Sequence, residues 1–195
     1  AQFDLAAIRA RAEAGDADAL NTLGNLAANG QGVAQNDAEA LRLYKLAADL
    51  GHAPANFNLG MMHELGRGTA RDLKAAFGFY LKAAESGFAP AQFNVGNMYA
   101  NGVGTEQDYF EAAIWFRQAA ERNVPEAQYN LGLAYELGRG LTKDETLAVK
   151  WYRAASDQGY ARARYNLGLM IEEGRGIAAD ETAAAALYRA AAEQG

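Results

Sequence analysis

The sequence contains no cysteine, which excludes disulfide bonds and thiol chemistry within this chain. It has only two histidines and two serines, and neither a His-Glu-x-x-His pattern nor a calcium-loop spacing occurs. The serines, Ser86 and Ser156, fall at the ends of expected helices, and no nucleophile–base arrangement is visible. We therefore expect no metal, no cofactor and no catalytic residue.

Long apolar runs and clusters of positive charge are also missing. No apolar stretch approaches about 18 residues, so no segment is expected to span a membrane. The net charge is −6, and the basic residues are scattered along the chain. Because phosphate binding needs a concentrated positive surface, we do not expect nucleic acid as a partner. The Gly-Arg-Gly segments also lack the Lys-Ser/Thr ending of a phosphate-binding loop.

What the sequence does contain is a repeat. The stretch AQYNLGLAYELGRG begins at Ala127, and near-copies begin at Ala55, Ala91 and Ala163, with a more divergent copy at Ala19. The copies follow one another at a spacing of 36 residues without insertion. A fixed period of this size indicates a solenoid of stacked units.

The pattern resembles the Sel1-like repeat, a relative of the tetratricopeptide repeat with a longer glycine-containing loop between its two helices. The positions that carry the resemblance in the fourth copy are Ala127, Leu131-Gly132, Tyr135, Gly138-Arg139-Gly140, Asp144, Ala148, Trp151-Tyr152, Ala155 and Gly159. The resemblance covers nearly the whole chain. It implies an all-α fold, an α/α solenoid that winds as a right-handed superhelix.

The period divides the chain into one expected domain, residues 1–195, of five helix-loop-helix repeats after a half-repeat helix. The half-repeat is 1–15, and the repeats are 16–51, 52–87, 88–123, 124–159 and 160–195. The first helices are predicted at 17–29, 53–65, 89–101, 125–137 and 161–173. In residues 2–14, Phe3, Leu5, Ile8 and Ala12 recur at helical spacing, which predicts a lone second helix.

Helix boundaries have local signals in every repeat. Predicted N-caps of the second helices are Asn36, Asp72, Asp108, Asp144 and Asp180, and Asn36/Glu39 and Asp108/Glu111 have capping-box spacing. Predicted stops after the second helices are Gly51, Gly87, Asn123, Gly159 and Gly195. The last helix is predicted at 181–194. Most of the glycines are thereby assigned to architecture.

The helical wheel separates a buried arc from an outward one. Ala127, Leu131, Gly132 and Tyr135 share one arc and are expected in the core, as are the aromatic residues of the second helices. His63 occupies the position of Tyr135 and is therefore predicted to be packed, whereas His52 is predicted to be a solvated turn residue.

The outward arc of the first helices is the candidate binding surface. In tetratricopeptide-like arrays the first helices line the concave side, and aromatic, Leu/Met and Asn side chains together suit an extended peptide. The candidate partner-binding residues are Phe57, Asn58, Met61, Phe93, Asn94, Asn97, Tyr129, Asn130, Leu133, Glu136, Tyr165, Asn166 and Leu169. Two alternatives stay open, since the aromatics can instead pack on the next repeat and the asparagines can bond a neighbouring carbonyl.

A second candidate surface is formed by Arg67, Arg139 and Arg175, which share one loop position and are expected to line up along one edge of the solenoid. Such a row of cations could meet an acidic partner. The alternative is that these arginines are solvated and that neighbouring Glu residues dilute their field.

The resemblance implies a non-catalytic scaffold that binds a protein or peptide partner. A structural spacer within a larger protein is the first alternative, and a β-lactam-binding or hydrolysing enzyme, like some cysteine-rich relatives, is the second. The resemblance favours a bacterial periplasmic or secreted protein. The last predicted helix lacks a polar capping helix, so we also expect either further sequence or end-to-end self-association at the C-terminal repeat.

Overall fold

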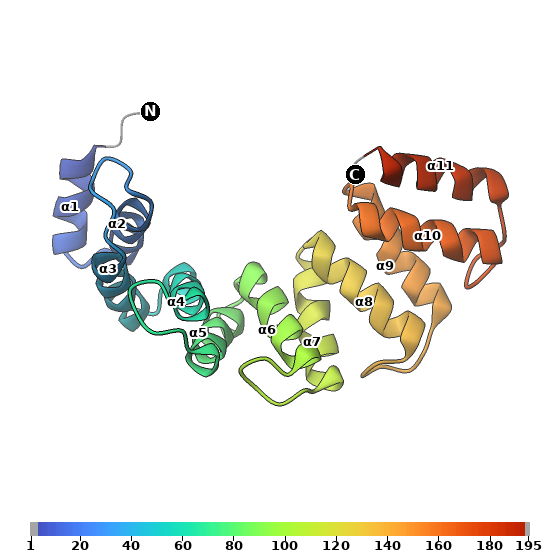
Figure 1. Cartoon of the computed structure of the whole chain (residues 1–195), viewed down its shortest axis with the longest axis horizontal. Helices are drawn as coiled ribbons and strands as arrows, with labels where there is room; N and C mark the ends of the chain where they lie inside the picture. The colour runs from blue at the N-terminus through green and yellow to red at the C-terminus, as the bar shows by residue number, and fades with distance from the viewer. Residues whose placement is uncertain (1–3, 194–195) are drawn as a thin grey trace. The chain divides into compact units, whose positions relative to one another are not determined.

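The computed structural model describes residues 4–193, which form eleven α-helices and no strand (Figure 1). Phe3 and Gly195, to which the sequence assigned a helix position and a helix stop, lie outside these residues. The helices are α1 (Leu5–Glu13), α2 (Ala17–Asn29), α3 (Asp37–Asp49), α4 (Ala53–Leu65), α5 (Leu73–Glu85), α6 (Ala89–Asn101), α7 (Tyr109–Glu121), α8 (Pro125–Leu137), α9 (Glu145–Asp157), α10 (Ala161–Glu173) and α11 (Glu181–Ala192).

The bounds of the five first helices, α2, α4, α6, α8 and α10, coincide with the predicted ranges. Each is followed by a loop and a second helix, so the described part of the chain is the all-α solenoid that the period predicted. The helix α1 precedes the first complete pair and begins at Leu5.

The predicted N-caps are confirmed, but the capping boxes are only half formed. Asn36 Oδ1 accepts from the backbone N–H of Glu39 at 3.0 Å, and the four aspartates cap their helices in the same way. The Glu39 carboxylate pairs with Arg42 instead of returning to Asn36. The backbone N–H of Asn36 donates to the carbonyl of Ala27 at 2.8 Å, which connects the loop to α2.

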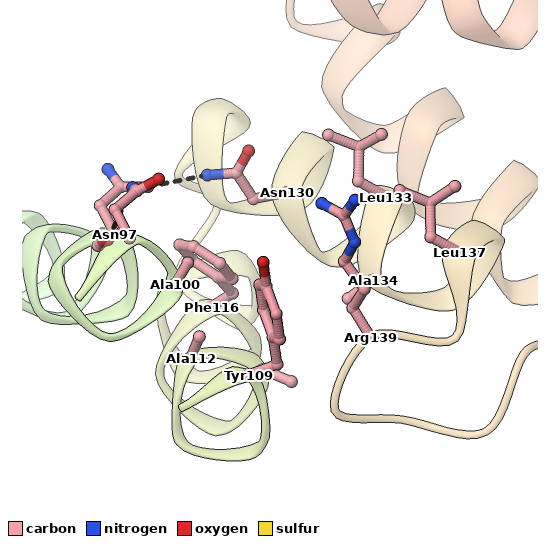
Figure 2. A pocket seen from close by; sticks show the side chains of 12 residues that line it. Asn97, Ala100, Tyr109, Ala112, Phe116, Asn130, Leu133, Ala134, Leu137 and Arg139 are labelled. Carbon is pink, nitrogen blue, oxygen red and sulfur yellow. Dashed lines mark hydrogen bonds between the residues drawn. The ribbon is translucent and has the colours of Figure 1, made fainter. Parts of the chain in front are cut away.

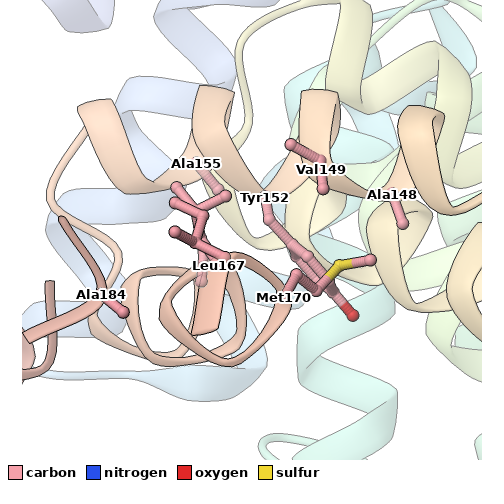
Figure 3. Packing of buried hydrophobic residues seen from close by; sticks show 9 residues of the cluster. Ala148, Val149, Tyr152, Ala155, Leu167, Met170 and Ala184 are labelled. Carbon is pink, nitrogen blue, oxygen red and sulfur yellow. The ribbon is translucent and has the colours of Figure 1, made fainter. Parts of the chain in front are cut away.

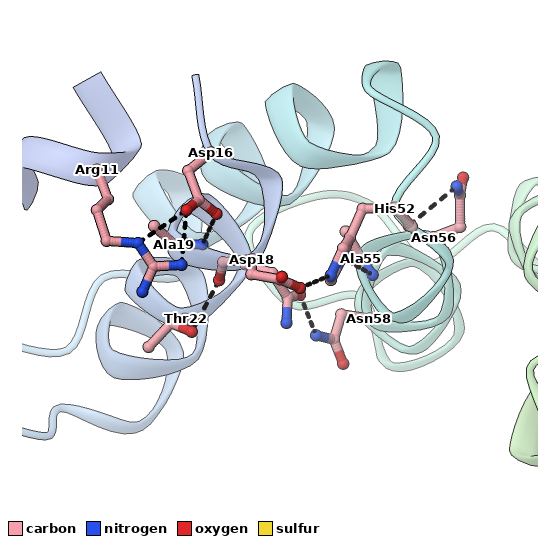
Figure 4. Close-up of polar contacts among 10 residues, drawn as sticks. Arg11, Asp16, Asp18, Ala19, Thr22, His52, Ala55, Asn56 and Asn58 are labelled. Atoms are coloured by element: carbon pink, nitrogen blue, oxygen red, sulfur yellow. Dashed lines mark hydrogen bonds and ion pairs between the residues drawn. The ribbon is translucent and has the colours of Figure 1, made fainter. Parts of the chain in front are cut away.

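The prediction for His52 was wrong, because this residue is the N-cap of α4 and not a solvated turn residue. Its Nδ1 accepts from the backbone N–H of Ala55 at 3.1 Å, and its Nε2 lies 2.8 Å from Asp18 Oδ1 on α2 (Figure 4). Only 13% of the side chain is exposed. The sequence signal was weak since histidine is not among the preferred N-caps. His63 is packed as predicted, with its ring stacked on Phe79 at 5.2 Å.

The Leu/Val-Gly pairs of the first helices allow close packing of the second helices. A Cβ atom added at the glycine of any of the five pairs would lie 2.5–2.7 Å from a ring atom of an aromatic residue. These aromatic residues are Tyr44, Tyr80, Phe116, Tyr152 and Tyr188, each from the second helix of the same repeat. Glycine at this position therefore makes room for one large ring in every repeat.

The chain forms two compact units. Unit 1 comprises Ala1–Val95 with Val103–Glu106, and unit 2 comprises Gly96–Gly102 with Gln107–Gly195. The core of each unit alternates alanines with a few large side chains. In unit 2, Tyr152, Leu167 and Met170 fill the space between α9 and α10, and alanines of α9 and α11 let the backbones approach (Figure 3). In unit 1, Tyr44, Leu59 and Met62 pack in the same way against alanines of α2 and α3.

Candidate functional site

A hollow of about 170 Å³ lies in unit 2 between α6, α7, α8 and the loop after α8, and is called the central hollow here (Figure 2). Its lining residues are Asn97, Ala100, Asn101, Tyr109, Ala112, Ala113, Phe116, Asn130, Leu133, Ala134, Leu137 and Arg139. Its lining combines apolar side chains with asparagine, tyrosine and arginine side chains.

A second hollow, the N-terminal hollow, occupies the equivalent place in unit 1. Its lining residues are Asn25, Ala28, Asn29, Tyr44, Asn58, Met61, Met62, Leu65 and Arg67, and each lies 72 residues before a lining residue of the central hollow. Both hollows occur where the repeat has Ala28 or Ala100 at a position held elsewhere by Glu64, Glu136 or Glu172. The short alanine side chain helps to leave this space open.

The structure gathers five of the predicted partner-binding residues in these hollows. Asn58 and Met61 line the N-terminal hollow, and Asn97, Asn130 and Leu133 line the central hollow. The remaining eight candidates lie elsewhere on the first helices.

The predicted aromatic residues pack against the aromatic residues of the second helices. The ring centroid of Phe57 lies 5.4 Å from that of Tyr80 and 5.3 Å from that of Phe88. Tyr129 lies 5.7 Å from Tyr152 and 5.4 Å from Tyr160, and burial raises the pKa of Tyr129. These rings therefore support the scaffold, which was one of the two alternatives left open by the sequence.

Two further aromatic candidates and one leucine complete the row. Tyr165 contacts Tyr188 at 5.5 Å but keeps 52% of its surface exposed. Phe93 and Leu169 are half-buried. Tyr165 is the aromatic member of the row that offers the largest surface to a partner.

The asparagines bond to side chains rather than to the backbone carbonyls considered above. Asn58 Nδ2 donates to Asn21 Oδ1 at 2.9 Å and to Asn25 Oδ1 at 3.2 Å. In unit 2, Asn130 Nδ2 donates to Asn97 Oδ1 at 3.1 Å. Amides of successive first helices are thus linked along the candidate surface.

Asn94 and Asn166 use a different acceptor, the tyrosine hydroxyl of the preceding second helix. Asn166 Nδ2 lies 3.2 Å from the Tyr152 hydroxyl oxygen, and Asn94 forms the corresponding bond with Tyr80. Asn130 has no such hydroxyl available because Phe116 stands at that position. This explains why Asn130 bonds to Asn97.

A tyrosine–glutamate hydrogen bond, which the sequence reasoning missed, recurs in three repeats. The hydroxyl donates to a carboxylate of the first helix in the pairs Tyr80–Glu64 at 2.5 Å, Tyr152–Glu136 at 2.5 Å and Tyr188–Glu172 at 2.6 Å. The candidate Glu136 is therefore engaged within the protein. A signal was available, since the third repeat has lost both members together and carries Ala100 and Phe116.

These contacts favour the neutral form of the buried phenols. Burial first, and then the bond to Glu136, raises the pKa of Tyr152, and Tyr80 is affected in the same way by burial and Glu64. The bond to Glu172 raises the pKa of Tyr188 to about 12, and burial raises the pKa of Tyr44 to about 12.

Stability should consequently fall in alkaline solution. A phenol whose pKa is higher in the folded than in the unfolded chain contributes its full stabilisation below the unfolded pKa of about 10 and loses it as the pH rises through the folded value. We expect the melting temperature to decrease progressively between about pH 10 and pH 12, and Tyr44→Phe to make this decrease shallower. Circular dichroism melts across this range measure both effects, and identical slopes for the two proteins would contradict the expectation.

Of the three loop arginines considered for an acidic partner, two bind carboxylates of this chain and one does not. Arg67 donates to Asp37 Oδ1 at 2.6 Å and to the carbonyl of Ala28 at 2.7 Å. The hydrogen bond from Arg67 to Asp37 holds the pKa of Asp37 below its usual range. Arg175 pairs with Glu136 at 2.8 Å and also with Glu173. About a third of each of these two side chains is still exposed, but both guanidinium groups already bind carboxylates of their own chain.

Arg139 differs from the other two arginines. Within residues 4–193 it forms no ion pair, and its guanidinium carbon lies 5.5 Å from the ring centroid of Tyr109. Arg139 also lines the central hollow, together with Tyr109. It is the exposed member of the row that can accept a new anionic partner.

Among residues 4–193, no group of three or more His, Asp or Glu residues could hold a metal ion. None of the described helices is both long and apolar enough to cross a membrane.

Comparison with known proteins identifies the repeat. The family model described as Sel1 repeat matches residues 17–52, 53–88, 89–124, 125–160 and 161–195. Among curated proteins, no sequence matches the chain.

Two solved structures are similar along most of the chain. One is c5321, a protective antigen from uropathogenic Escherichia coli strains with an SLR fold, at 34% identity and a TM-score of 0.92 over 96% of this chain. The chain spans only 40% of the length of that structure. The other is a Sel1 repeat protein from Oxalobacter formigenes, at 35% identity and a TM-score of 0.89, with 93% of this chain and 74% of that one covered.

A more distant similarity concerns the fold alone. The immunity protein Pa5087 from Pseudomonas aeruginosa has 23% identity and a TM-score of 0.55, with 97% of this chain and 72% of that chain covered. The repeat architecture is therefore shared at low sequence identity.

Proposed function

The chain belongs to the Sel1 repeat family, whose members generally serve as protein-interaction scaffolds, and from this we propose that it holds an extended segment of a protein partner along its first helices. The proposed role is non-catalytic. Each hollow, with the asparagine and apolar side chains around it, is proposed as a contact point for such a segment.

The observation that carries the proposal is the recurrence of one hollow in two repeats with the same chemistry. In each hollow an asparagine lies beside an apolar residue of the same helix, Asn58 with Met61 and Asn130 with Leu133. An amide can bond a peptide backbone while the apolar lining accepts a side chain, which is how extended peptides are commonly recognised.

Exposed apolar side chains border both hollows. Leu65 is 65% exposed and Leu137 is 51% exposed, and they occupy equivalent positions at the ends of α4 and α8. A partner that covers them would remove apolar surface from water, which contributes roughly 25 cal/mol per Å². Their repetition beside the hollows supports a shared binding role rather than a chance exposure.

A random-peptide display selection against the folded protein tests this proposal. Enriched peptides should lose affinity about ten-fold or more on Leu133→Ser, because a buried apolar contact of about 1.5–3 kcal/mol is replaced by a small polar group. The titration can be followed by fluorescence anisotropy of a labelled peptide.

The matched control is Leu46→Ser on α3, since Leu46 is also exposed, at 41%, but lies outside both hollows. This variant should bind the peptides like the unaltered protein. Peptides that bind equally well to both variants, or a selection that enriches none, would contradict the proposed surface.

A further inference from the structure

The repeat after the central hollow shows how this position of the fold can hold a carboxylate. Glu136 on α8 lies between two donors, with Oε2 accepting from the Tyr152 hydroxyl and Oε1 accepting from Arg175 Nη1 at 2.8 Å. Only 16% of the Glu136 side chain is exposed. In that repeat the loop arginine is therefore neutralised by a carboxylate that the chain itself supplies.

The central hollow has the arginine but not the carboxylate. Arg139 is the counterpart of Arg175, whereas Ala100 replaces Glu136 and Phe116 replaces Tyr152. None of the twelve residues that line the central hollow is acidic. The positive charge that a glutamate balances in the next repeat has no such partner here.

The N-terminal hollow provides an internal comparison. It also has alanine, Ala28, at the glutamate position, but its arginine, Arg67, is paired with Asp37. The counterpart of Asp37 at the central hollow is Tyr109, which offers only a ring to Arg139. The two positions that supply an anionic partner are those of Glu136 and Asp37. Of the three loop arginines, only Arg139 has an uncharged residue at both of these positions.

The space fits the missing group. A glutamate side chain has four heavy atoms more than alanine, which occupy at most about 120 Å³ if each takes the volume share of a water molecule, about 30 Å³. The central hollow measures about 170 Å³. Figure 2 shows the Arg139 guanidinium, the Tyr109 hydroxyl and the Asn130 amide around the same space as Ala100 and Phe116.

We propose that the central hollow is a carboxylate-binding site in which Arg139 receives a glutamate side chain of the partner. This inference rests on the proposed function, because it names the chemistry of the segment that the first helices hold. The partner's carboxylate takes the place that Glu136 has in the next repeat. Leu133 and Leu137 cover the methylene groups, and Asn130 lies within the same lining to orient the chain.

The test uses a small probe, so that it does not depend on finding the partner. N-acetylglutamate α-amide carries one side-chain carboxylate, and N-acetylglutamine α-amide is its neutral isostere. In the full chain labelled with ¹⁵N-arginine, the Nε–H signal of Arg139 should shift saturably with the charged probe. The affinity for the neutral probe should be lower by about tenfold or more, since a charge-assisted hydrogen bond is lost. The signals of Arg67 and Arg175 should stay unchanged.

Two variants separate this site from non-specific charge attraction. Ala100→Glu returns the chain's own carboxylate to the hollow, and it should abolish the response of Arg139 while raising the melting temperature. Arg139→Gln should lose probe binding without lowering the melting temperature, because Arg139 has no ion pair among the described residues. Unchanged probe binding in Ala100→Glu would overturn the proposal.

The remaining outcomes also decide the matter. Equal shifts of Arg139 and Arg67, or equal binding of the two probes, would show general charge attraction and overturn the site. Tighter binding of N-acetylalanine, whose only carboxylate is terminal, would overturn the assignment to a glutamate side chain. If peptides from the display selection bind while the charged probe does not, the carboxylate inference fails and the proposed function stands.

Discussion

Replacing Gly140 with alanine is expected to lower the free energy of unfolding by about 3 kcal/mol or more. A Cβ atom at Gly140 would lie within 2.7 Å of three backbone atoms at the start of α7, and its contact with the Tyr109 carbonyl oxygen would be the shortest of them. Backbone of a helix cannot rotate away as a side chain can. The φ angle of +70° adds strain, which costs about 1–2 kcal/mol for a residue with a Cβ atom.

The matched control is Gly32→Ala, because Gly32 occupies the same loop position in the first repeat. Its φ of +72° is nearly the same, yet nothing lies within 4 Å of an added Cβ atom. This substitution should cost only about 1–2 kcal/mol, the price of the left-handed conformation. Urea denaturation followed by circular dichroism measures both values, and equal losses would show that the contact with Tyr109 does not contribute.

The same contact recurs at the second glycine of two other loops. A Cβ atom at Gly68 would lie 2.6 Å from the Asp37 carbonyl oxygen, and one at Gly176 would lie 2.3 Å from that of Glu145. The second glycine of each of these Gly-x-Gly pairs therefore joins neighbouring repeats in addition to turning the chain. From sequence alone, only the turn was recognised, because a contact between residues about 31 positions apart leaves no local signal.

The parts of the fold that depend on local chemistry were predictable. First-helix bounds followed from the period together with proline and glycine positions, and the second-helix starts followed from Asp72 and its equivalents. Asn123 adopts a φ of 61°, as expected for a residue at the helix-stop position that glycine occupies in the other repeats. These features need only a few neighbouring residues.

Side-chain partners on other helices were not predictable in the same way. The wheel placed Tyr129 on the outward arc, but the ring packs between Tyr152 and Tyr160 because the next repeat covers that side. The pairing of Arg175 with Glu136 joins residues 39 positions apart in sequence. For the candidate surface, the sequence therefore predicted which helices present it but not which side chains remain available for a partner.

The second large effect is expected inside the core, at Gly132 on α8. A Cβ atom there would lie 2.7 Å from both Cδ1 and Cε1 of Tyr152. The ring is completely buried and its hydroxyl is held by Glu136 and Asn166, so it cannot move aside without weakening these bonds. We expect Gly132→Ala to destabilise the protein by about 3 kcal/mol, from overpacking and from the strained hydrogen bond to a charged acceptor.

A glycine without such a neighbour should behave in the opposite way. Gly78 lies in the interior of α5, and nothing is found within 4 Å of an added Cβ atom. Gly78→Ala should therefore stabilise the protein by about 0.5–1 kcal/mol, because alanine loses less backbone freedom on folding. The difference in sign between two glycines of helix interiors, measured by urea denaturation, isolates the effect of the Tyr152 ring from helix propensity.

A double-mutant cycle assigns the cost of Gly132→Ala to one contact. In a Tyr152→Ala background the ring is absent, so the added methyl group should no longer clash and the propensity gain of alanine should appear. The cost of Gly132→Ala should then fall from about 3 kcal/mol to zero or below. If it stayed near its original value, the close approach of α8 and α9 would not depend on Tyr152. The glycine would then be required by another contact of α8, and that contact would have to explain the Leu/Val-Gly pair of each repeat.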